Sequence, residues 1–287
     1  MNHPADRWVD LGGIRLHLRE WVPDKEEPIA HPFVLLHGLS SNAATWDLVA
    51  GALSAEGHPV FAVDQRGHGL SDKPEGGYDF VTVSADLFTL IDRLDLKNVV
   101  LAGQSWGGNV LLEFAARYPG RAAGYVFVDG GFLNLRQRGT WENVSQELRP
   151  PDIAGTPSAV IKERIASMHP HWSPEAVALT LKNLELLPDG TVRPWLRLDR
   201  HMAILKALHN QEVLRLFARV REPVLICAAA DGSEWDLRKR DQVAVAAELI
   251  PRAEVRWFQQ TAHDIHLDRP QDLAAAMLDF ADGLETS

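Results

Sequence analysis

A Gly-x-Ser-x-Gly motif places one hydroxyl group where a nucleophile is expected. Residues 99–102 are apolar, and Gly103, Ser105 and Gly107 follow directly. Beyond them apolar residues recur with the period of a buried helix face, at Val110, Leu111, Phe114 and Ala115. A strand that turns this sharply into a helix needs small residues around its tip and leaves the tip side chain exposed. The motif therefore predicts an exposed Ser105 hydroxyl at a helix N-terminus, whose dipole favours developing negative charge.

A serine hydroxyl needs a base, because it is a poor nucleophile at neutral pH. Histidine titrates in the working range and can return the proton to a leaving group. His263, directly after the small residue Ala262, and His266 are the two candidates near the C-terminus. Their spacing also suits two metal ligands, but no third or fourth ligand follows at a matching spacing, so we expect no metal.

The base in turn needs a carboxylate that fixes its tautomer and stabilises the imidazolium. Asp231 follows the apolar run 224–229, and Asp236 lies a few residues beyond it. Asp129 stands at the tip of another predicted strand, residues 125–128. The residue pattern favours Asp231 and Asp129 over Asp236 and leaves the choice between the first two open.

Composition limits the class of protein. The chain has 287 residues, 46% hydrophobic and 24% charged, with a formal net charge of -10. This acidic balance argues against a nucleic-acid partner, because phosphate binding needs a basic surface. Residues 1–7 contain no apolar leader, and no apolar run approaches ~18 residues, so we expect a cytoplasmic protein with no membrane partner. A homo-oligomer is left open, and the single Cys227 is expected to be buried.

Strands and helices alternate along most of the chain, which favours a mostly parallel sheet with helices on both faces. The predicted strands cover residues 8–11, 14–21, 33–36, 59–63, 99–103, 125–128, 224–229 and 254–258. Residues 132–220 interrupt this alternation with no convincing strand. They hold predicted helices at 159–168, 174–184 and 202–217. The sequence thus predicts a core of residues 1–131 and 221–287 with a helical insertion between its two parts.

Four motifs occur in a characteristic order: His37-Gly38 after a core strand, the glycine-rich stretch Asp64–Asp72, the Gly103–Gly107 motif, and the histidine loop Thr261–Leu267. Together they resemble the α/β-hydrolase superfamily, and in particular serine esterases and lipases with a helical cap, over residues 8–285. The resemblance implies an α/β fold with a mostly parallel, eight-stranded, doubly wound sheet. It also implies that residues 132–220 form a cap, or lid.

The resemblance assigns roles within the site. It implies Ser105 as nucleophile and His263 as base, with His266 packed one turn further on. It makes the backbone N–H groups of Leu39 and Trp106 an oxyanion hole. The remaining residues that we expect around a substrate are His37, Gly38, Trp141 and Trp172. The family's usual position for the acid falls near Asp231, one residue out of register, and Asp129 occupies an alternative position.

The nucleophile also restricts the reaction. Dehalogenases and epoxide hydrolases of this fold attack with an aspartate, whereas this chain has Ser105. The sequence therefore predicts a serine hydrolase that cleaves a small to medium, largely apolar ester through an acyl-enzyme, without a cofactor. A lactone, thioester or carbon–carbon bond hydrolase with the same triad is the alternative. A receptor-like α/β-hydrolase that binds a ligand with little turnover is the rival from another class.

Overall fold

A computed structural model describes residues 3–23, 31–233 and 235–284. An eight-stranded sheet forms the centre of the molecule, with the strand order β1-β2-β4-β3-β5-β6-β10-β11. β2 pairs antiparallel with β1 and β4, and the other neighbours run parallel. Their bounds are β1 Ala5–Asp10, β2 Arg15–Trp21, β3 Phe33–Leu36, β4 Val60–Val63, β5 Val100–Gln104, β6 Gly124–Val128, β10 Val224–Ala230 and β11 Ala253–Gln259. The predicted fold class is confirmed.

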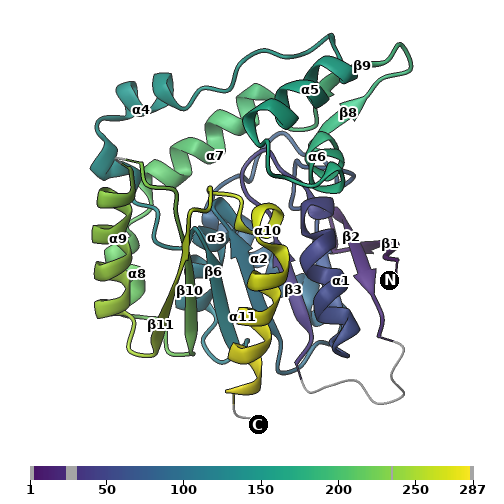
Figure 1. Cartoon of the computed structure of the whole chain (residues 1–287). Coiled ribbons are helices and arrows are strands. Elements are labelled where there is room, and N and C mark those ends of the chain that lie inside the picture. The colour runs from purple at the N-terminus through teal and green to yellow at the C-terminus, as the bar shows by residue number, and fades with distance from the viewer. Residues whose placement is uncertain (1–2, 24–30, 234, 285–287) are drawn as a thin grey trace.

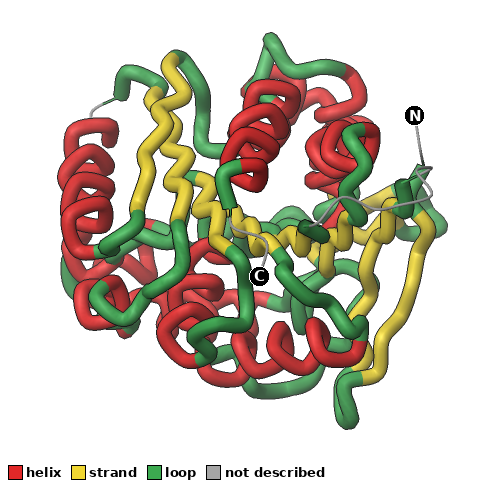
Figure 2. The backbone as a smooth tube through the Cα atoms, turned by 90° about the horizontal axis from the view of Figure 1, so that it is seen from below, coloured by secondary structure: helices red, strands yellow, loops and turns green. Residues whose placement is uncertain are grey.

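Helices cover both faces of this twisted sheet (Figure 2). The short central strands are buried throughout, so their successive side chains enter two different cores. In β3, Val34 and Leu36 join one apolar cluster, whereas Phe33 and Leu35 join the other. The first cluster includes residues of α2 (Phe80–Arg93), α3 (Trp106–Arg117), α8 (Val213–Phe217) and α9 (Trp235–Leu249). The second includes residues of α1 (Asp47–Ala55) and α11 (Pro270–Asp282).

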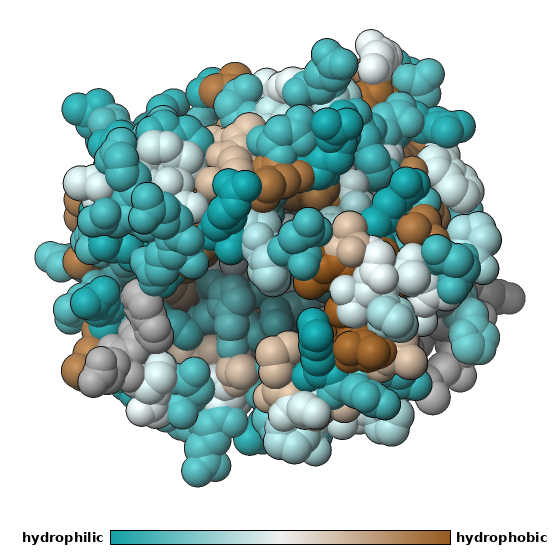
Figure 3. Space-filling model, turned by 90° about the horizontal axis from the view of Figure 1, so that it is seen from above, coloured by the Kyte–Doolittle hydropathy of each residue, from teal (hydrophilic) through white to brown (hydrophobic). Residues whose placement is uncertain are grey.

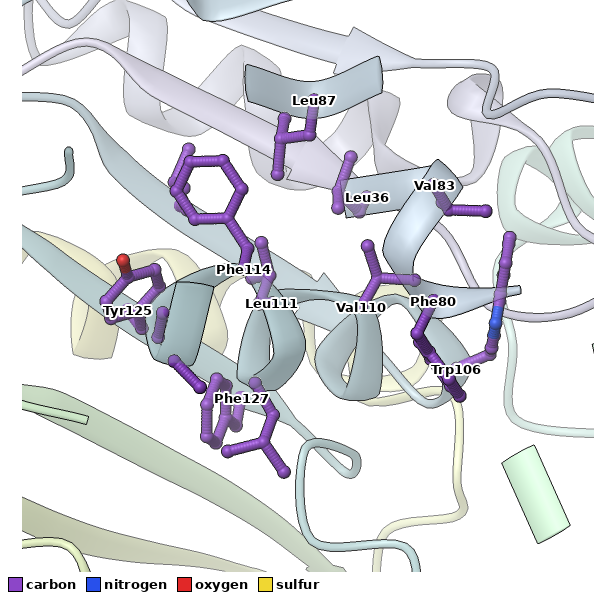
Figure 4. Packing of buried hydrophobic residues seen from close by; sticks show 14 of the residues in the cluster. Leu36, Phe80, Val83, Leu87, Trp106, Val110, Leu111, Phe114, Tyr125 and Phe127 are labelled. Atoms are coloured by element: carbon purple, nitrogen blue, oxygen red, sulfur yellow. The ribbon is translucent and has the colours of Figure 1, made fainter. Parts of the chain in front are cut away.

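Helix α3 is buried along almost its whole length, from Trp106 to Ala116. Figure 4 shows its side chains packed between α2 and the sheet: Val110, Leu111 and Phe114 lie among Val83, Leu87, Leu36, Tyr125 and Phe127. A helix packed on all sides in this way keeps its first turn in one place. The residue just before that turn is Ser105.

Residues 132–220, which we call the cap segment, leave the sheet after β6 and return to it at β10. Most of them lie over the upper edge of the sheet in Figure 1, where the parallel strands end, whereas α8 lies beside α9 and packs into the first cluster. The segment contains η2 (Leu135–Arg138), α4 (Trp141–Glu147), α5 (Ser158–Met168), α6 (Pro174–Leu181), α7 (Leu198–Asn210) and α8. The predicted helix over 202–217 is in fact two helices, because the chain turns at Gln211, whose side chain bonds to Asn109 of α3.

The prediction that the cap segment contains no strand is wrong. A small antiparallel sheet joins β7 (Thr156–Pro157), β9 (Thr191–Pro194) and β8 (Leu184–Leu186). These strands have two to four residues and are largely half-buried or exposed, so they lack the apolar runs that mark a core strand. The Pro188-Asp189-Gly190 turn between β8 and β9 is the local signal that indicates a hairpin. Among the described helices, none is long and apolar enough to cross a membrane.

Candidate active site

Ser105 lies at the tip between β5 and α3 in a strained conformation, with φ 51° and ψ -118°. The glycines that flank it are required by close backbone contacts. A Cβ atom on Gly103 would lie 2.5 Å from the carbonyl of Gly107, and one on Gly107 would lie 2.7 Å from the carbonyl oxygens of Leu36 and His37. The sharp elbow predicted from the sequence is therefore present, and its small residues have the predicted steric reason.

His263 follows β11 in the loop before α10 (Ile265–Asp268), and it meets a buried carboxylate. Its Nδ1 lies 2.6 Å from Oδ2 of Asp129, at the end of β6. The Asp129 side chain is only 2% exposed, and its Oδ1 accepts a 2.9 Å hydrogen bond from the Ala229 N–H. The structure thus brings together His263 and Asp129, two of the residues predicted from the sequence.

This pair lies beside the elbow. The Ser105 N–H donates to the carbonyl of Val128, the residue before Asp129, at 2.9 Å. Gln104, the residue before Ser105, donates from Nε2 to Asp264, the residue after His263, at 3.3 Å. One backbone bond and one side-chain bond thus link the elbow residues Ser105 and Gln104 to the neighbours of Asp129 and His263 in the chain. The side chain of His263 is 49% exposed, so solvent reaches the site.

The charges of the pair favour the ion pair over two neutral groups. Burial favours the protonated acid, but the hydrogen bond and charge of His263, together with Lys239, hold the pKa of Asp129 below its ordinary value. Partial burial favours the neutral ring of His263, yet the hydrogen bond and charge of Asp129 outweigh it and raise the pKa of His263 above 6.5. Asp129 therefore stabilises an imidazolium, as a base that receives a proton requires.

Asp231 and Asp236 do not join this pair. Asp231 is exposed, and its Oδ1 accepts from the N–H of Ser233 in its own turn at 2.9 Å. Asp236 is buried and accepts from the N–H of Gly232 at 2.8 Å. Both carboxylates therefore cap the turn after β10. Of the two acids that the sequence left open, Asp129 contacts His263 and Asp231 does not.

The predicted oxyanion loop passes directly over the serine. A Cβ atom on Gly38 would lie 3.2 Å from Cβ of Ser105 and would force the end of the Gln104 side chain to move, so the loop backbone lies close to both residues. This contact places Leu39, the next residue, at the elbow. Trp106 is the first residue of α3, and the N–H groups of a first helical turn have no intrahelical acceptor. Both predicted donors thus lie at the site.

His37 supports this loop and does not face a substrate, contrary to our prediction. It is fully buried, its Nδ1 lies 2.7 Å from the carbonyl of Gly38, and its Nε2 accepts from the N–H of Gln65 at 3.1 Å. Burial lowers the pKa of His37, so the neutral form with one donor and one acceptor fits these two contacts. Asp64 and Arg66 brace the neighbouring loop: Asp64 accepts from the N–H groups of Ala43 and Leu70, and Arg66 pairs with Asp86.

The tryptophans pack into apolar clusters. Trp106 and Trp46 are 1% and 0% exposed, and Trp46 lies against the buried ring of His266 at 4.9 Å. Trp172, predicted to line the substrate site, is buried within the cap segment and stacks on His169 at 3.8 Å. Trp141, predicted for the same role, packs against other cap side chains, the ring of His209 and Nζ of Lys206. Their contacts explain them as packing residues.

An open pocket of about 660 Å³ lies at the surface of the cap segment, and we call it the cap cavity. Its lining is half apolar and half charged: Pro194, Leu196, Leu198 and Met202, with Arg149, Arg197, Asp152 and Asp199. Figure 3 looks down on the face that carries the cap segment and shows a hollow whose floor is hydrophilic. Within the described parts of the chain, no three His, Cys, Asp or Glu residues are grouped to hold a metal ion.

Three features of the site were not foreseen. Gly130 presses against Ser105, since a Cβ atom there would overlap the serine carbonyl; the Gly-Gly pair after a strand tip was the available signal. Asn109 links α3 to two distant parts of the chain, because it accepts from the Gly131 N–H, just before the cap segment, and donates to Gln211 within it. Lys239 contacts Asp129, and nothing in the pattern of α9 distinguishes it from a surface lysine.

With this geometry in place, the chain can be compared with known proteins. The sequence profile of the alpha/beta hydrolase family matches residues 33–276. The chain belongs to this family. Among its relatives, this hydrolase is 26% identical to 2-(acetamidomethylene)succinate hydrolase of Mesorhizobium japonicum, over 98% of this chain and 96% of that one. It is 35% identical to epoxide hydrolase A of Mycobacterium tuberculosis, over 99% of both chains.

Solved structures agree with this family assignment. The crystal structure of E-2-(acetamidomethylene)succinate hydrolase matches with a TM-score of 0.82 and 25% identity, over 98% of this chain and 100% of that one. A thioesterase domain from the curacin biosynthetic pathway matches with a TM-score of 0.76 at 20% identity, over 97% and 100% of the two chains. The second likeness supports the fold alone.

Proposed function

We propose that this hydrolase transfers an acyl group to water through a Ser105–His263–Asp129 triad. The observation that carries the proposal is the contact between His263 and the buried Asp129, 2.6 Å long, beside the strained Ser105 elbow. A carboxylate that holds and charges an imidazole next to a half-buried hydroxyl is the arrangement that nucleophilic acyl transfer needs.

The reaction follows from these groups. His263 accepts the Ser105 proton as the serine oxygen bonds to the acyl carbon, and the carbonyl electrons move to oxygen. The N–H groups of Leu39 and Trp106 stabilise this oxyanion. The tetrahedral intermediate expels the leaving group, which takes the proton from His263, and an acyl-enzyme remains. Water, deprotonated by His263, then repeats the sequence and releases the acid and Ser105.

This chemistry separates the chain from its relative named an epoxide hydrolase. A carboxylate that opens an epoxide forms an ester, which water can cleave and so regenerate the enzyme. A serine that opens an epoxide forms an ether, which has no carbonyl for water to attack. Ser105 therefore supports turnover of acyl compounds, and an epoxide would at most alkylate it.

For the substrate we propose a small to medium, largely apolar carboxylic ester. Pro194, Leu196, Leu198 and Met202 supply apolar surface in the cap cavity. A C–N bond is the second candidate, because a relative that matches nearly the whole chain is named 2-(acetamidomethylene)succinate hydrolase. The charges of the pocket do not add to this argument, because Asp152 and Asp199 balance Arg149 and Arg197 there, and Arg197 pairs with Asp199 at 3.2 Å.

The test combines labelling with turnover. The wild type should hydrolyse p-nitrophenyl butyrate, and a fluorophosphonate probe should form one adduct, on Ser105. Ser105→Ala should lose both, while Ser54→Ala, a serine of α1 outside the site, should keep both. A folded wild type that is neither labelled nor active would refute the proposal. Parallel assays with aryl esters, lactones, thioesters and N-acyl enamines would then rank the substrate classes.

A further inference from the structure

A lysine from another part of the fold contacts the acid of the proposed triad. Lys239, in α9, lies with Nζ 2.9 Å from Oδ2 of Asp129, the same oxygen that meets His263 at 2.6 Å. It also donates to the carbonyl of Ala229, at the end of β10, at 2.8 Å. The Lys239 side chain is 19% exposed, so the contact is largely shielded from water. One ammonium group thus links α9, β10 and the acid.

The position of this charge matters because Asp129 is buried. A buried carboxylate needs a compensating positive charge or hydrogen-bond donors. His263 acts as a base only while it is neutral, so in the resting state its ring does not balance the charge of Asp129. The ion pair of Lys239 with Asp129, 2.9 Å long, supplies that balance at the same carboxylate oxygen.

We propose that Lys239 is a positioning residue that keeps Asp129 ionised and turned toward His263, and that lowers the pH at which His263 becomes a free base. This inference rests on the function proposed above. Its basis is geometric: the nitrogens of Lys239 and His263 share one carboxylate oxygen, and the second bond of Lys239 to Ala229 fixes where the ammonium lies.

The sign follows from the charges around His263. The positive charge of Lys239 opposes protonation of the ring, whereas Asp129 and Asp264 favour it. Other titratable groups face the same cluster. Asp231 lies exposed at the end of β10, and the Cys227 thiol lies within β10. His266 in α10 is held neutral by burial. Removing the lysine charge should therefore raise the pKa of His263, by about one pH unit for screening between that of bulk water and that of a protein surface.

The experiment compares four variants with the wild type. Lys239→Met removes the charge and keeps the length of the side chain. Lys239→Gln removes the charge and keeps a hydrogen-bond donor, and Lys239→Arg keeps both the charge and the donors. Lys97→Met is the matched control, because Lys97 pairs with Asp95 on the exposed surface, 73% and 86% exposed. Two quantities are measured: the acid limb of kcat/KM for p-nitrophenyl butyrate, and the NMR titration of the His263 ring, assigned with His263→Gln.

We expect Lys239→Met and Lys239→Gln to raise both the pH midpoint of the acid limb of kcat/KM and that of the His263 NMR titration by about one pH unit. Lys239→Arg and Lys97→Met should stay near the wild type in both measurements. A uniform loss of kcat with no shift in either measurement would overturn the inference, as would loss of the folded protein in both neutral variants. The NMR titration needs no turnover, so failure of the esterase assay alone would count against the proposed function and not against the role of Lys239.

Discussion

Replacing Asp129 with asparagine is the sharpest test of the site. All three groups around the carboxylate that lie within hydrogen-bond distance act as donors: the Ala229 N–H to Oδ1, and Lys239 and His263 to Oδ2. Asparagine offers one oxygen and one NH₂ group. Whichever way it turns, its NH₂ group faces a donor, and the negative charge that stabilises the imidazolium is gone.

The expected loss follows from these contacts. One unsatisfied buried donor costs about 1–3 kcal/mol, and hydrogen bonds to charged groups contribute about 1.5–3 kcal/mol. A combined loss of about 3–5 kcal/mol in the transition state lowers kcat/KM by roughly 10²- to 10⁴-fold. Asp231→Asn is the matched control, because Asp231 is exposed and caps only its own turn. We expect it to keep activity within about twofold of the wild type.

The assay is kcat/KM for p-nitrophenyl butyrate, with circular dichroism to show that each variant is folded. If folded Asp129→Asn kept kcat/KM within about threefold of the wild-type value, the contact between His263 and Asp129 would not contribute to catalysis. The reverse pattern, with Asp231→Asn inactive and Asp129→Asn active, would assign the acid to the loop after β10.

Three further outcomes are expected. Burial lowers the pKa of His266 to about 4, so as the pH falls the unfolded chain binds a proton before the folded chain does. Acidification from pH 6.5 to about 4 should therefore lower the free energy of unfolding by about 3 kcal/mol. Urea unfolding of His266→Phe should lack this loss, and a pH profile equal to that of the wild type would contradict the assignment. Gly130→Ala should abolish fluorophosphonate labelling, because its Cβ overlaps the Ser105 carbonyl, whereas Gly51→Ala has open space and should label normally. Asn109→Ala removes a hydrogen-bond partner from the buried Gly131 N–H and from Oε1 of the buried Gln211, and it should lower the free energy of unfolding by about 2–4 kcal/mol. A change under about 0.5 kcal/mol would show that water replaces the side chain.

The core could be predicted from the sequence because its signals are local. The strand before Ser105, the flanking glycines and the helix period occupy neighbouring positions, and each has one steric reason. The eight strands of the sheet likewise follow from apolar runs separated by helices. The same reasoning failed for β7, β8 and β9, whose short, half-exposed strands depend on one another and on the turn before Thr191.

The acid could not be chosen from the sequence because the choice depends on distance. Asp129 and Asp231 both end parallel strands, β6 and β10, which are neighbours in the sheet. Only the paths of the two following loops decide which carboxylate reaches His263. Lys239 shows the same limit, since its contact joins residues 110 positions apart in the chain.

Asp129, which contacts His263, and Asp231, which does not, follow two different strands, β6 and β10. In the proposed triad the acid directly follows β6, and Asp231 and Asp236 make local capping contacts in the turn after β10. That turn is therefore available for insertions, such as an affinity tag or a grafted binding loop, without displacing a reacting group. The opposite holds for β6, where the chain enters the cap segment three residues after Asp129. Exchanging this cap for that of a relative would place the new junction beside the carboxylate, so transplanted specificity should depend on how residues 129–132 are joined.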